Sequence, residues 1–213
     1  MQRIIKMIQL LEKAYPSAKT ELLFNNPFQL LIATILSAQT TDKTVNKITP
    51  VLFKKYKTPF DFAKADIEEL KKYIKGVNYY NTKAINIKKL AEIIVNQYNG
   101  EIPSTIDKLI QLPGVARKTA NVVLSQGFGR AEGIVVDTHV KRLAERLELS
   151  KAKTPEKIEQ DLMKLIPYEK WISFPFALIL HGRAVCKAKN PLCGICILKP
   201  LCPYGKASKC QTS

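Results

Sequence analysis

Four cysteines in the last thirty or so residues are spaced as metal ligands would be. Cys186, Cys193, Cys196 and Cys202 follow the pattern C-x6-C-x2-C-x5-C. In a reducing cytosol disulfides are disfavoured, and cysteines grouped in this way more often bind a metal. Zinc ribbons pair two short C-x2-C knuckles, whereas only one pair here has that spacing. The pattern therefore predicts a metal centre, and Cys210, which lies outside it, is expected to be a free thiol.

A second candidate is a tight turn within residues 112–120, which read LPGVARKTA. Pro113 and Gly114 interrupt two helical stretches. The backbone amides of Gly114, Val115 and Ala116 are expected to face outward with the positive end of the following helix, an arrangement that binds a phosphate. The segment thus has the form of a helix-hairpin-helix. An ordinary corner between two helices is the alternative that Pro-Gly alone leaves open.

Lys118 stands just after this turn and is a candidate nucleophile. A lysine attacks carbon only as the free amine, although its reference pKa is about 10.4. Its place in the first turn of a helix beside Arg117, together with burial under a bound nucleotide, would favour the neutral amine. A surface lysine that binds phosphate is the alternative.

A carboxylate with a possible catalytic role follows in the segment Val135-Val136-Asp137-Thr138-His139. Asp137 is a favoured residue for capping a helix, and the helix N-terminus would keep it ionised. Such an anion can also stabilise positive charge that develops in a transition state. The two roles are compatible. His139 is expected to be mainly structural, with a phosphate contact as the alternative.

These motifs resemble the endonuclease III family of DNA glycosylases and AP lyases, and the resemblance runs nearly end to end. The family's hairpin reads LPGVGRKTA, so Ala116 replaces its second glycine. The sequence VDTH at residues 136–139 and the sequence LHGR at residues 180–183, before the cysteines, also match the family. The replacement requires a backbone angle that alanine can adopt.

The resemblance implies roles for the residues above. Lys118 would be the nucleophile, Asp137 the catalytic carboxylate, and the four cysteines the ligands of a [4Fe-4S] cluster. The implied activity is base excision: removal of oxidised or ring-saturated pyrimidines from duplex DNA through a Schiff base on Lys118. Cleavage on the 3′ side of the abasic site by β-elimination would follow. The implied substrate is double-stranded DNA that contains damaged bases or abasic sites.

The resemblance also assigns residues that contact DNA. Lys187 and Lys189 lie in the first cysteine loop, which meets DNA phosphates in the family. An enzyme that acts on a base must extrude the nucleotide and fill the gap. Gln39 matches the glutamine that enters this gap, and Tyr79 occupies the position of a second, apolar wedge. Both residues could otherwise be ordinary loop side chains.

The elements expected to position these residues are helices. Asn26 and Pro27 begin an apolar helix, and Asp42 can cap the next one, which continues to about Tyr56. Further pieces end at Gly76, a candidate left-handed residue, before a helix over 81–99. Alternation typical of strands is nearly absent, so an all-α fold is expected.

The resemblance implies two helical domains. A six-helix barrel would cover residues 20–131 and contain the helix-hairpin-helix at about 106–125. Residues 1–19 and 132–213, from both ends of the chain, would form the iron-sulfur cluster domain. No internal repeat or flexible linker interrupts this division.

The charge and hydropathy of the sequence limit the kinds of partner that the protein is expected to bind. Lysine and arginine number 34 against 18 aspartates and glutamates, a formal net charge of +16. This excess favours a polyanion such as nucleic acid, although lysines also serve simply to solvate helices. No apolar run approaches the length of a membrane span. We therefore expect a cytoplasmic, nucleoid-associated monomer that binds DNA and no membrane.

Two other functions remain open on the sequence. A glycosylase that removes adenine or thymine from mismatches would use water instead of lysine as the nucleophile, and Lys118 argues against it. A DNA-binding protein without catalytic activity would use the hairpin and the cluster only for structure.

Overall fold

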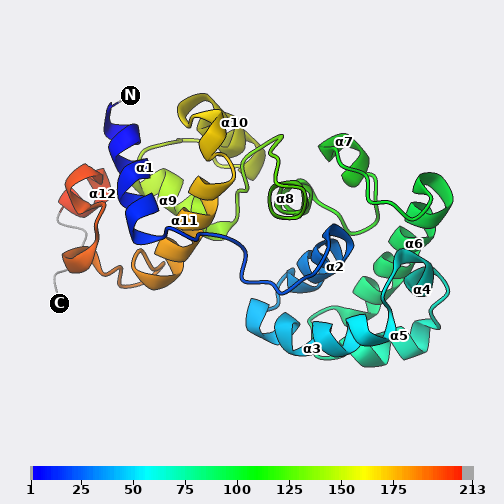
Figure 1. The fold of residues 1–213 in the computed structure, drawn as a ribbon. Helices are drawn as coiled ribbons and strands as arrows, with labels where there is room; N and C mark the ends of the chain where they lie inside the picture. Colours follow the sequence, from blue (N-terminus) through cyan, green and yellow to red (C-terminus); the bar gives the residue numbers. More distant parts are fainter. Residues whose placement is uncertain (1, 208–213) are drawn as a thin grey trace. The chain divides into compact units, whose positions relative to one another are not determined.

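The computed structural model describes residues 2–207, and this part of the chain is helical with no strand. The all-α prediction is confirmed. The chain divides into two compact units, one built from residues 1–20 and 133–213 and the other from residues 21–132 (Figure 1). Cys210 lies outside the described residues. Among those residues, no helix is long and apolar enough to cross a membrane.

Helix α2 (Pro27–Ser37) is the centre of the second unit. The Asn26 side chain accepts a hydrogen bond from the Gln29 amide at 2.9 Å, and Pro27 occupies the first turn, as expected for a helix start. Residues 28–36 are all buried. A helix that is apolar on every side must be covered on every side. Helices α3, α6 and α8 and the turn η1 contact it (Figure 1).

The other helices in the first part of this unit begin and end mostly where the sequence signals predict. They are α3 (Asp42–Lys55), α4 (Pro59–Ala63), α5 (Ile67–Ile74) and α6 (Tyr80–Tyr98). One capping prediction is wrong: Thr41 caps α3 and Asp42 is its first residue, because the Thr41 hydroxyl reaches the Thr44 amide at 3.2 Å.

The prediction that Gly76 has a left-handed backbone is also wrong. Gly76 does not have a positive φ, whereas Tyr79, three residues later, has a φ of 57°. Tyr79 caps the start of α6, which therefore begins at Tyr80, one residue before the expected start.

The hairpin joins two short helices, α7 (Ile106–Leu109) and α8 (Arg117–Val122). Helix α8 continues into a π-helical turn, η1 (Val123–Gly127), so the helical path reaches past Ser125. Most of α8 after Lys118 is buried, from Thr119 to Val122. Contact with α2 therefore fixes the helix that follows the hairpin turn.

The first unit is built around α11 (Ser173–Ala184), which packs against α1 (Gln2–Ala14) and α9 (Thr138–Arg146). Helix α10 (Pro155–Leu165) contacts α9, and the Thr154 side chain caps it. The turn η2 (Tyr168–Lys170) precedes α11. Three short elements follow α11, namely η3 (Cys193–Ile195), η4 (Lys199–Leu201) and α12 (Pro203–Lys206), and the four cysteines lie in them or in the segments that lead to them.

Helices α9 and α11 approach each other closely at Gly182. A Cβ atom at this position would lie 3.0 Å from the Cβ of His139 and 3.1 Å from Nη2 of Arg142. The glycine carbonyl also accepts a hydrogen bond from Arg142 at 3.0 Å. The absence of a side chain at Gly182 therefore sets the spacing between the two helices.

Substitution of Gly182 by alanine should weaken this packing. We expect the free energy of unfolding to fall by about 1–3 kcal/mol, as for other overpacked core sites, in urea unfolding followed by circular dichroism. Gly194→Ala is the control in the same unit, because its Cβ would meet no atom within 4 Å. Equal stability of the two variants would contradict the packing argument.

Candidate functional site

The hairpin turn depends on the backbone of Gly114, which has a φ of 79°. Only glycine adopts this left-handed conformation without strain. The Val115 amide donates to the Leu112 carbonyl at 3.1 Å, and the Val115 side chain is buried. Its amide therefore does not face outward as expected. The candidate phosphate contacts of the turn narrow to the amides of Gly114 and Ala116.

Ala116 is compatible with the turn although the family has glycine at this position. Its φ of −86° and ψ of 165° are extended angles that any residue adopts. It is also exposed, so its methyl group displaces no packed atom. No side chain caps the start of α8. Backbone N–H groups at such a helix start are suited to bind an anion.

Lys118 is the second residue of α8 and is exposed. Its neighbours Thr119 and Ala120 are buried. Helix α8 therefore holds the backbone of Lys118 in the core of the second unit while its side chain reaches the surface beside the hairpin turn. Asp137 belongs to the first unit.

Asp137 caps α9 as expected. Its Oδ1 atom accepts hydrogen bonds from the amides of His139 and Val140, both at 2.8 Å. The cap uses one carboxylate oxygen and leaves Oδ2 outside it. The same side chain can therefore order the helix start and present a negative charge.

His139 is held within the first unit. Its Nδ1 lies 3.1 Å from Nη2 of Arg142, and the ring packs against Gly182. Burial lowers the pKa of His139, and the positive charges of Arg142 and Arg183 lower it further, against the opposing effect of Asp137. These contacts favour the structural role, and the phosphate contact stays a prediction.

Gln39 and Tyr79 lie in two loops that are joined by hydrogen bonds. Both residues are exposed and both have left-handed backbones, with φ values of 56° and 57°. Asn78, which precedes Tyr79, donates from its side chain to the Gln39 carbonyl and from its amide to Thr40 Oγ1 at 3.0 Å. The structure therefore brings the two predicted wedge residues together. The role of Asn78 has no signature in the sequence.

The four predicted metal ligands line one cavity in the first unit, together with Val185, Pro191, Leu192, Lys199, Tyr204 and Gly205. Cys186, Cys196 and Cys202 are free thiols in this structure. Among the described residues, no three His, Cys, Asp or Glu side chains are arranged to hold a single metal ion. A cluster that uses all four cysteines requires each of them as a thiolate.

The surroundings of the sulfur atoms suit thiolate ligands. Arg146 Nη1 donates to Cys186 Sγ at 3.2 Å, and the Gly205 amide donates to Cys202 Sγ at 3.3 Å. His181 Nε2 lies 3.3 Å from Cys196 Sγ. Burial raises the pKa of the Cys196 and Cys202 thiols, so binding of iron must drive their deprotonation. Hydrogen bonds to sulfur are also among the factors that set the reduction potential of a cluster.

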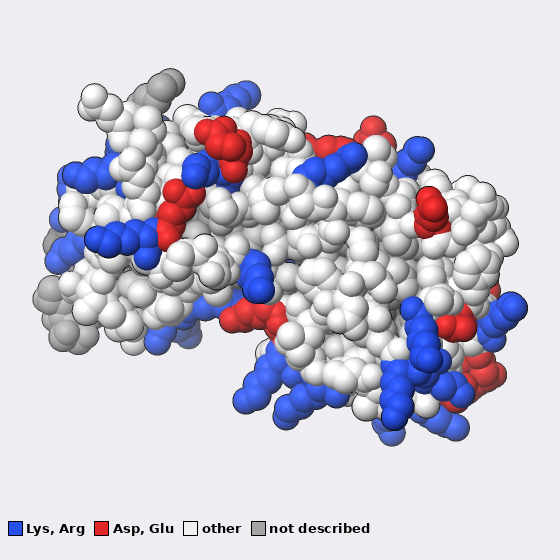
Figure 2. Space-filling model, viewed as in Figure 1, with Lys and Arg blue, Asp and Glu red and all other residues white. Residues whose placement is uncertain are grey.

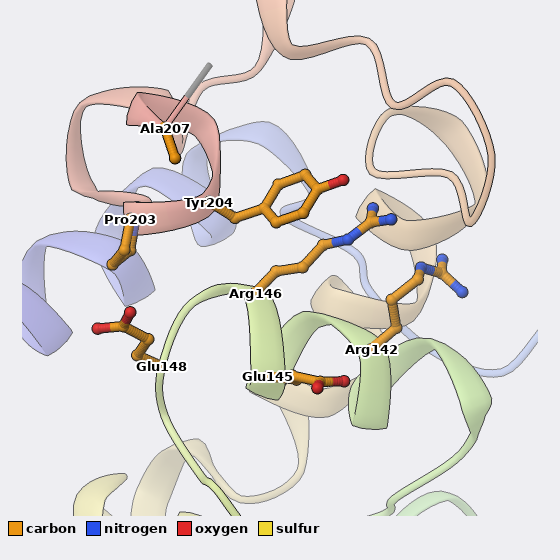
Figure 3. Close-up of a pocket in the computed structure, with 7 residues that line it drawn as sticks. All are labelled: Arg142, Glu145, Arg146, Glu148, Pro203, Tyr204 and Ala207. Carbon is orange, nitrogen blue, oxygen red and sulfur yellow. The ribbon is translucent and has the colours of Figure 1, made fainter. Parts of the chain in front are cut away.

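Two arginines that the sequence analysis did not single out hold the first cysteine loop. Arg142 donates to the Cys186 carbonyl, and Arg146 donates to the carbonyls of Lys187 and Ala188 at 2.7 and 3.0 Å. The Arg146 guanidinium also lies 4.5 Å from the centre of the Tyr204 ring. Figure 3 shows the two arginine side chains projecting from α9, with the Tyr204 ring beside Arg146.

These contacts leave a pocket beside the loop, lined by Arg142, Glu145, Arg146, Glu148, Pro203, Tyr204 and Ala207 (Figure 3). Lys187 and Lys189 are exposed on the loop itself. Figure 2 shows lysine and arginine side chains spread over the visible surface, with acidic side chains between them. The net charge of +16 thus lies on a surface that attracts DNA phosphates.

Comparison with known families defines the class of protein. The profile of the HhH-GPD superfamily of base excision DNA repair proteins matches residues 32–168, which contain the hairpin. The profile of the iron-sulfur binding domain of endonuclease III matches residues 186–202, from the first to the last of the four cysteines. The fold and the cysteine motif thus define a base excision DNA repair protein with an iron-sulfur domain.

The chain belongs to the endonuclease III family. Endonuclease III of Synechocystis is 50% identical over 207 residues, which cover 97% of this chain and 94% of the relative. Two solved structures are 46% identical with a TM-score of 0.91, and each match covers 96% of both chains. One is a non-covalent complex of endonuclease III with DNA, and the other is a trapped covalent intermediate of endonuclease III with DNA.

These matches confirm the predicted class of enzyme, a DNA glycosylase with AP lyase activity that acts in base excision repair. They also confirm the predicted [4Fe-4S] cofactor. The roles of the individual site residues stay predictions.

The four-cysteine cavity leads to a spectroscopic prediction. The purified protein should be brown and absorb broadly near about 400 nm, from charge transfer between sulfur and iron. Metal analysis should find iron and sulfide, and Cys196→Ser should reduce the absorbance per mole of protein. A colourless preparation with one zinc ion per chain would contradict the cluster.

Proposed function

We propose that this enzyme removes oxidised or ring-saturated pyrimidines from duplex DNA, with Lys118 as the nucleophile and Asp137 as the catalytic carboxylate. The observation that carries the proposal is an exposed lysine in the first turn of α8, directly after a turn in which Gly114 and Ala116 are exposed and no side chain caps the helix start. The superfamily match at residues 32–168 includes both Lys118 and Asp137. The relative trapped as a covalent intermediate with DNA supports chemistry through a protein nucleophile.

In the first step, Nζ of Lys118 attacks C1′ of the deoxyribose as a free amine. The bond between C1′ and the base breaks, and the base leaves with the bonding electron pair and gains a proton. Loss of a proton from nitrogen and opening of the sugar ring then give a Schiff base.

Strand cleavage follows from this Schiff base. The positively charged nitrogen acidifies the neighbouring carbon, C2′, and loss of a proton there expels the phosphate at C3′. Water then hydrolyses the remaining Schiff base and releases Lys118. A glycosylase that uses water as its nucleophile would have no need for this lysine.

Asp137 contributes its negative charge. Positive charge builds on the deoxyribose as the glycosidic bond breaks, and a nearby carboxylate lowers the energy of that transition state. The same group can accept a proton from the attacking amine. The cap fixes Oδ1, so a carboxylate in a defined orientation is available through Oδ2.

The remaining candidates bind and open the duplex. The amides of Gly114 and Ala116 would hold one phosphate, while Lys187 and Lys189 would contact others. Such contacts position DNA without reading its sequence. Gln39 and Tyr79 would fill the space that the extruded nucleotide leaves. The four thiolates would hold the [4Fe-4S] cluster, which when bound ties together both ends of the first cysteine loop.

We propose a monomer that works at the nucleoid in the cytoplasm.

Borohydride trapping tests the nucleophile. A duplex with an abasic site, reduced in the presence of cluster-loaded protein, should give a covalent adduct that is absent for Lys118→Gln. Lys108→Gln is the matched control, because Lys108 is an exposed lysine in α7 of the same hairpin. Duplexes with thymine glycol or dihydrouracil should also be cleaved and trapped, and a G:T mismatch should not.

Absence of an adduct from cluster-loaded wild-type protein would overturn the lyase mechanism. It would leave either a monofunctional glycosylase, if bases are still released, or a DNA-binding protein, if they are not.

The charge of Asp137 can be tested separately from its cap. Asp137→Asn should lower the single-turnover rate of base release by roughly 10²–10⁴-fold, while the free energy of unfolding changes by less than about 1 kcal/mol, since asparagine caps as well as aspartate. Asp66→Asn is the control, because Asp66 caps α5 through the Glu69 amide at 2.8 Å. A rate for Asp137→Asn equal to that of the control would remove Asp137 from the mechanism.

A further inference from the structure

Lys83 of α6 is a lysine buried in the second unit, with 7% of its surface exposed. Its Nζ donates to the carbonyls of Leu36 and Ala38, both at 2.7 Å. Burial lowers the pKa of this ammonium group. A buried lysine is unfavourable unless its donors are satisfied, so the two carbonyls are a specific requirement of this position.

Both carbonyls belong to the end of α2. The last carbonyls of a helix lack partners within the helix and carry the negative end of its dipole. Helix α2 has no basic residue in its own last turn. Lys83 therefore supplies, from another helix, the positive charge that the end of α2 lacks. Gln39 is the next residue after this anchored segment.

Asn78 anchors the other side of Gln39. Its side chain donates to the Gln39 carbonyl, and its amide donates to Thr40 Oγ1 at 3.0 Å. Together with Lys83, it holds the chain at residues 36, 38, 39 and 40. Such anchoring is needed because Gln39, with a φ of 56°, has a conformation that is unfavourable for a residue other than glycine.

The same two residues also flank Tyr79. Asn78 precedes it, and the Lys83 amide donates to the Tyr79 carbonyl at 3.0 Å in the first turn of α6. Tyr79 itself has a left-handed backbone, and its side chain is 66% exposed. The backbone amide of Lys83 is thus hydrogen-bonded to Tyr79. Its side chain is hydrogen-bonded to the chain segment that directly precedes Gln39.

We propose that Lys83, together with Asn78, is a positioning residue for opening the duplex: it holds Gln39 and Tyr79 at a fixed separation so that both enter the base stack as one rigid wedge. The proposal rests on the proposed function. Two side chains that are already held in place lose little conformational entropy when the protein binds DNA. They can therefore keep the bases from restacking at a lower cost in free energy. Loops that moved independently would have to be ordered during base extrusion itself.

The test compares two substrates that differ in the need for base extrusion. In single-turnover assays, Lys83→Met should release dihydrouracil from a duplex about tenfold or more slowly than wild type, because hydrogen bonds to a charged group are lost. Strand cleavage at a preformed abasic site should slow less than about threefold, since unstacking is least demanding where no base is paired. This second activity also shows that the variant is folded and loaded with its cluster.

Three further variants separate positioning from stability. Lys88→Met is the matched control, because Lys88 of the same helix donates to the Ala65 carbonyl at 2.9 Å, away from both wedge residues. It should leave both rates within about twofold of wild type. Lys83→Arg, which keeps the charge, should recover part of the lost rate. Asn78→Ala alters an exposed residue and should reproduce the selective loss of base release.

A direct readout is the fluorescence of 2-aminopurine placed opposite dihydrouracil. Wild-type protein should raise it on binding as the bases unstack, and Lys83→Met should raise it less at saturating protein. Equal loss of both activities in Lys83→Met, or the same loss in Lys88→Met, would overturn the positioning role. Wild-type protein that leaves dihydrouracil in place would instead overturn the proposed function, whereas active wild type with unaffected Lys83→Met would overturn the positioning role alone.

Discussion

An α-helix leaves about four amides at its start and about four carbonyls at its end without partners in the helix. In this helical protein, several of the candidate catalytic and DNA-contact residues stand at such ends. Asp137 caps the start of α9, and Lys118 lies in the first turn of α8. Gln39 follows the end of α2. The unpaired groups and the helix dipole provide charge at these ends, while the buried body of each helix provides rigidity. These candidate residues are therefore concentrated at the starts and ends of helices.

Helix α2 links several of these ends within the second unit. It is buried along its length and contacts both α6 and α8. The hairpin turn lies before α8, and Tyr79 lies before α6. A packing change in α2 would therefore reach the candidate phosphate-binding turn and both candidate wedge residues. In the first unit α9 has a similar place: Asp137 begins it, and Arg146 at its other end holds the cysteine loop.

Much of the fold could be predicted because caps and breaks have local causes. Asn26 with Pro27 marks a helix start that the structure contains. The cap at Thr41 in place of Asp42 could not be distinguished, since either side chain can cap and only the geometry decides. Gly76 was expected to be left-handed on the basis of its residue type. The hydrogen bonds of Asn78, two residues later, instead accompany the left-handed backbone of Tyr79.

The candidate site, too, could be predicted from the sequence only in part. The cysteine spacing and the hairpin have strong patterns, so the iron-sulfur centre and a candidate nucleophile, Lys118, could be predicted from the sequence. Lys83 lies on the buried stripe of α6 with Ala84, Ile87 and Leu90, a position where a lysine is unusual. That signal was present in the sequence. Its partners, however, are backbone carbonyls some 45 residues away, which no side-chain pattern reveals.

The central claim is that the enzyme becomes covalently attached to DNA through the lysine after the hairpin. The most direct measurement is peptide mapping of the borohydride-reduced complex by mass spectrometry after digestion of the protein and the DNA. The sugar remnant should be attached to Nζ of Lys118. A remnant attached to any other amine of the protein would contradict this claim.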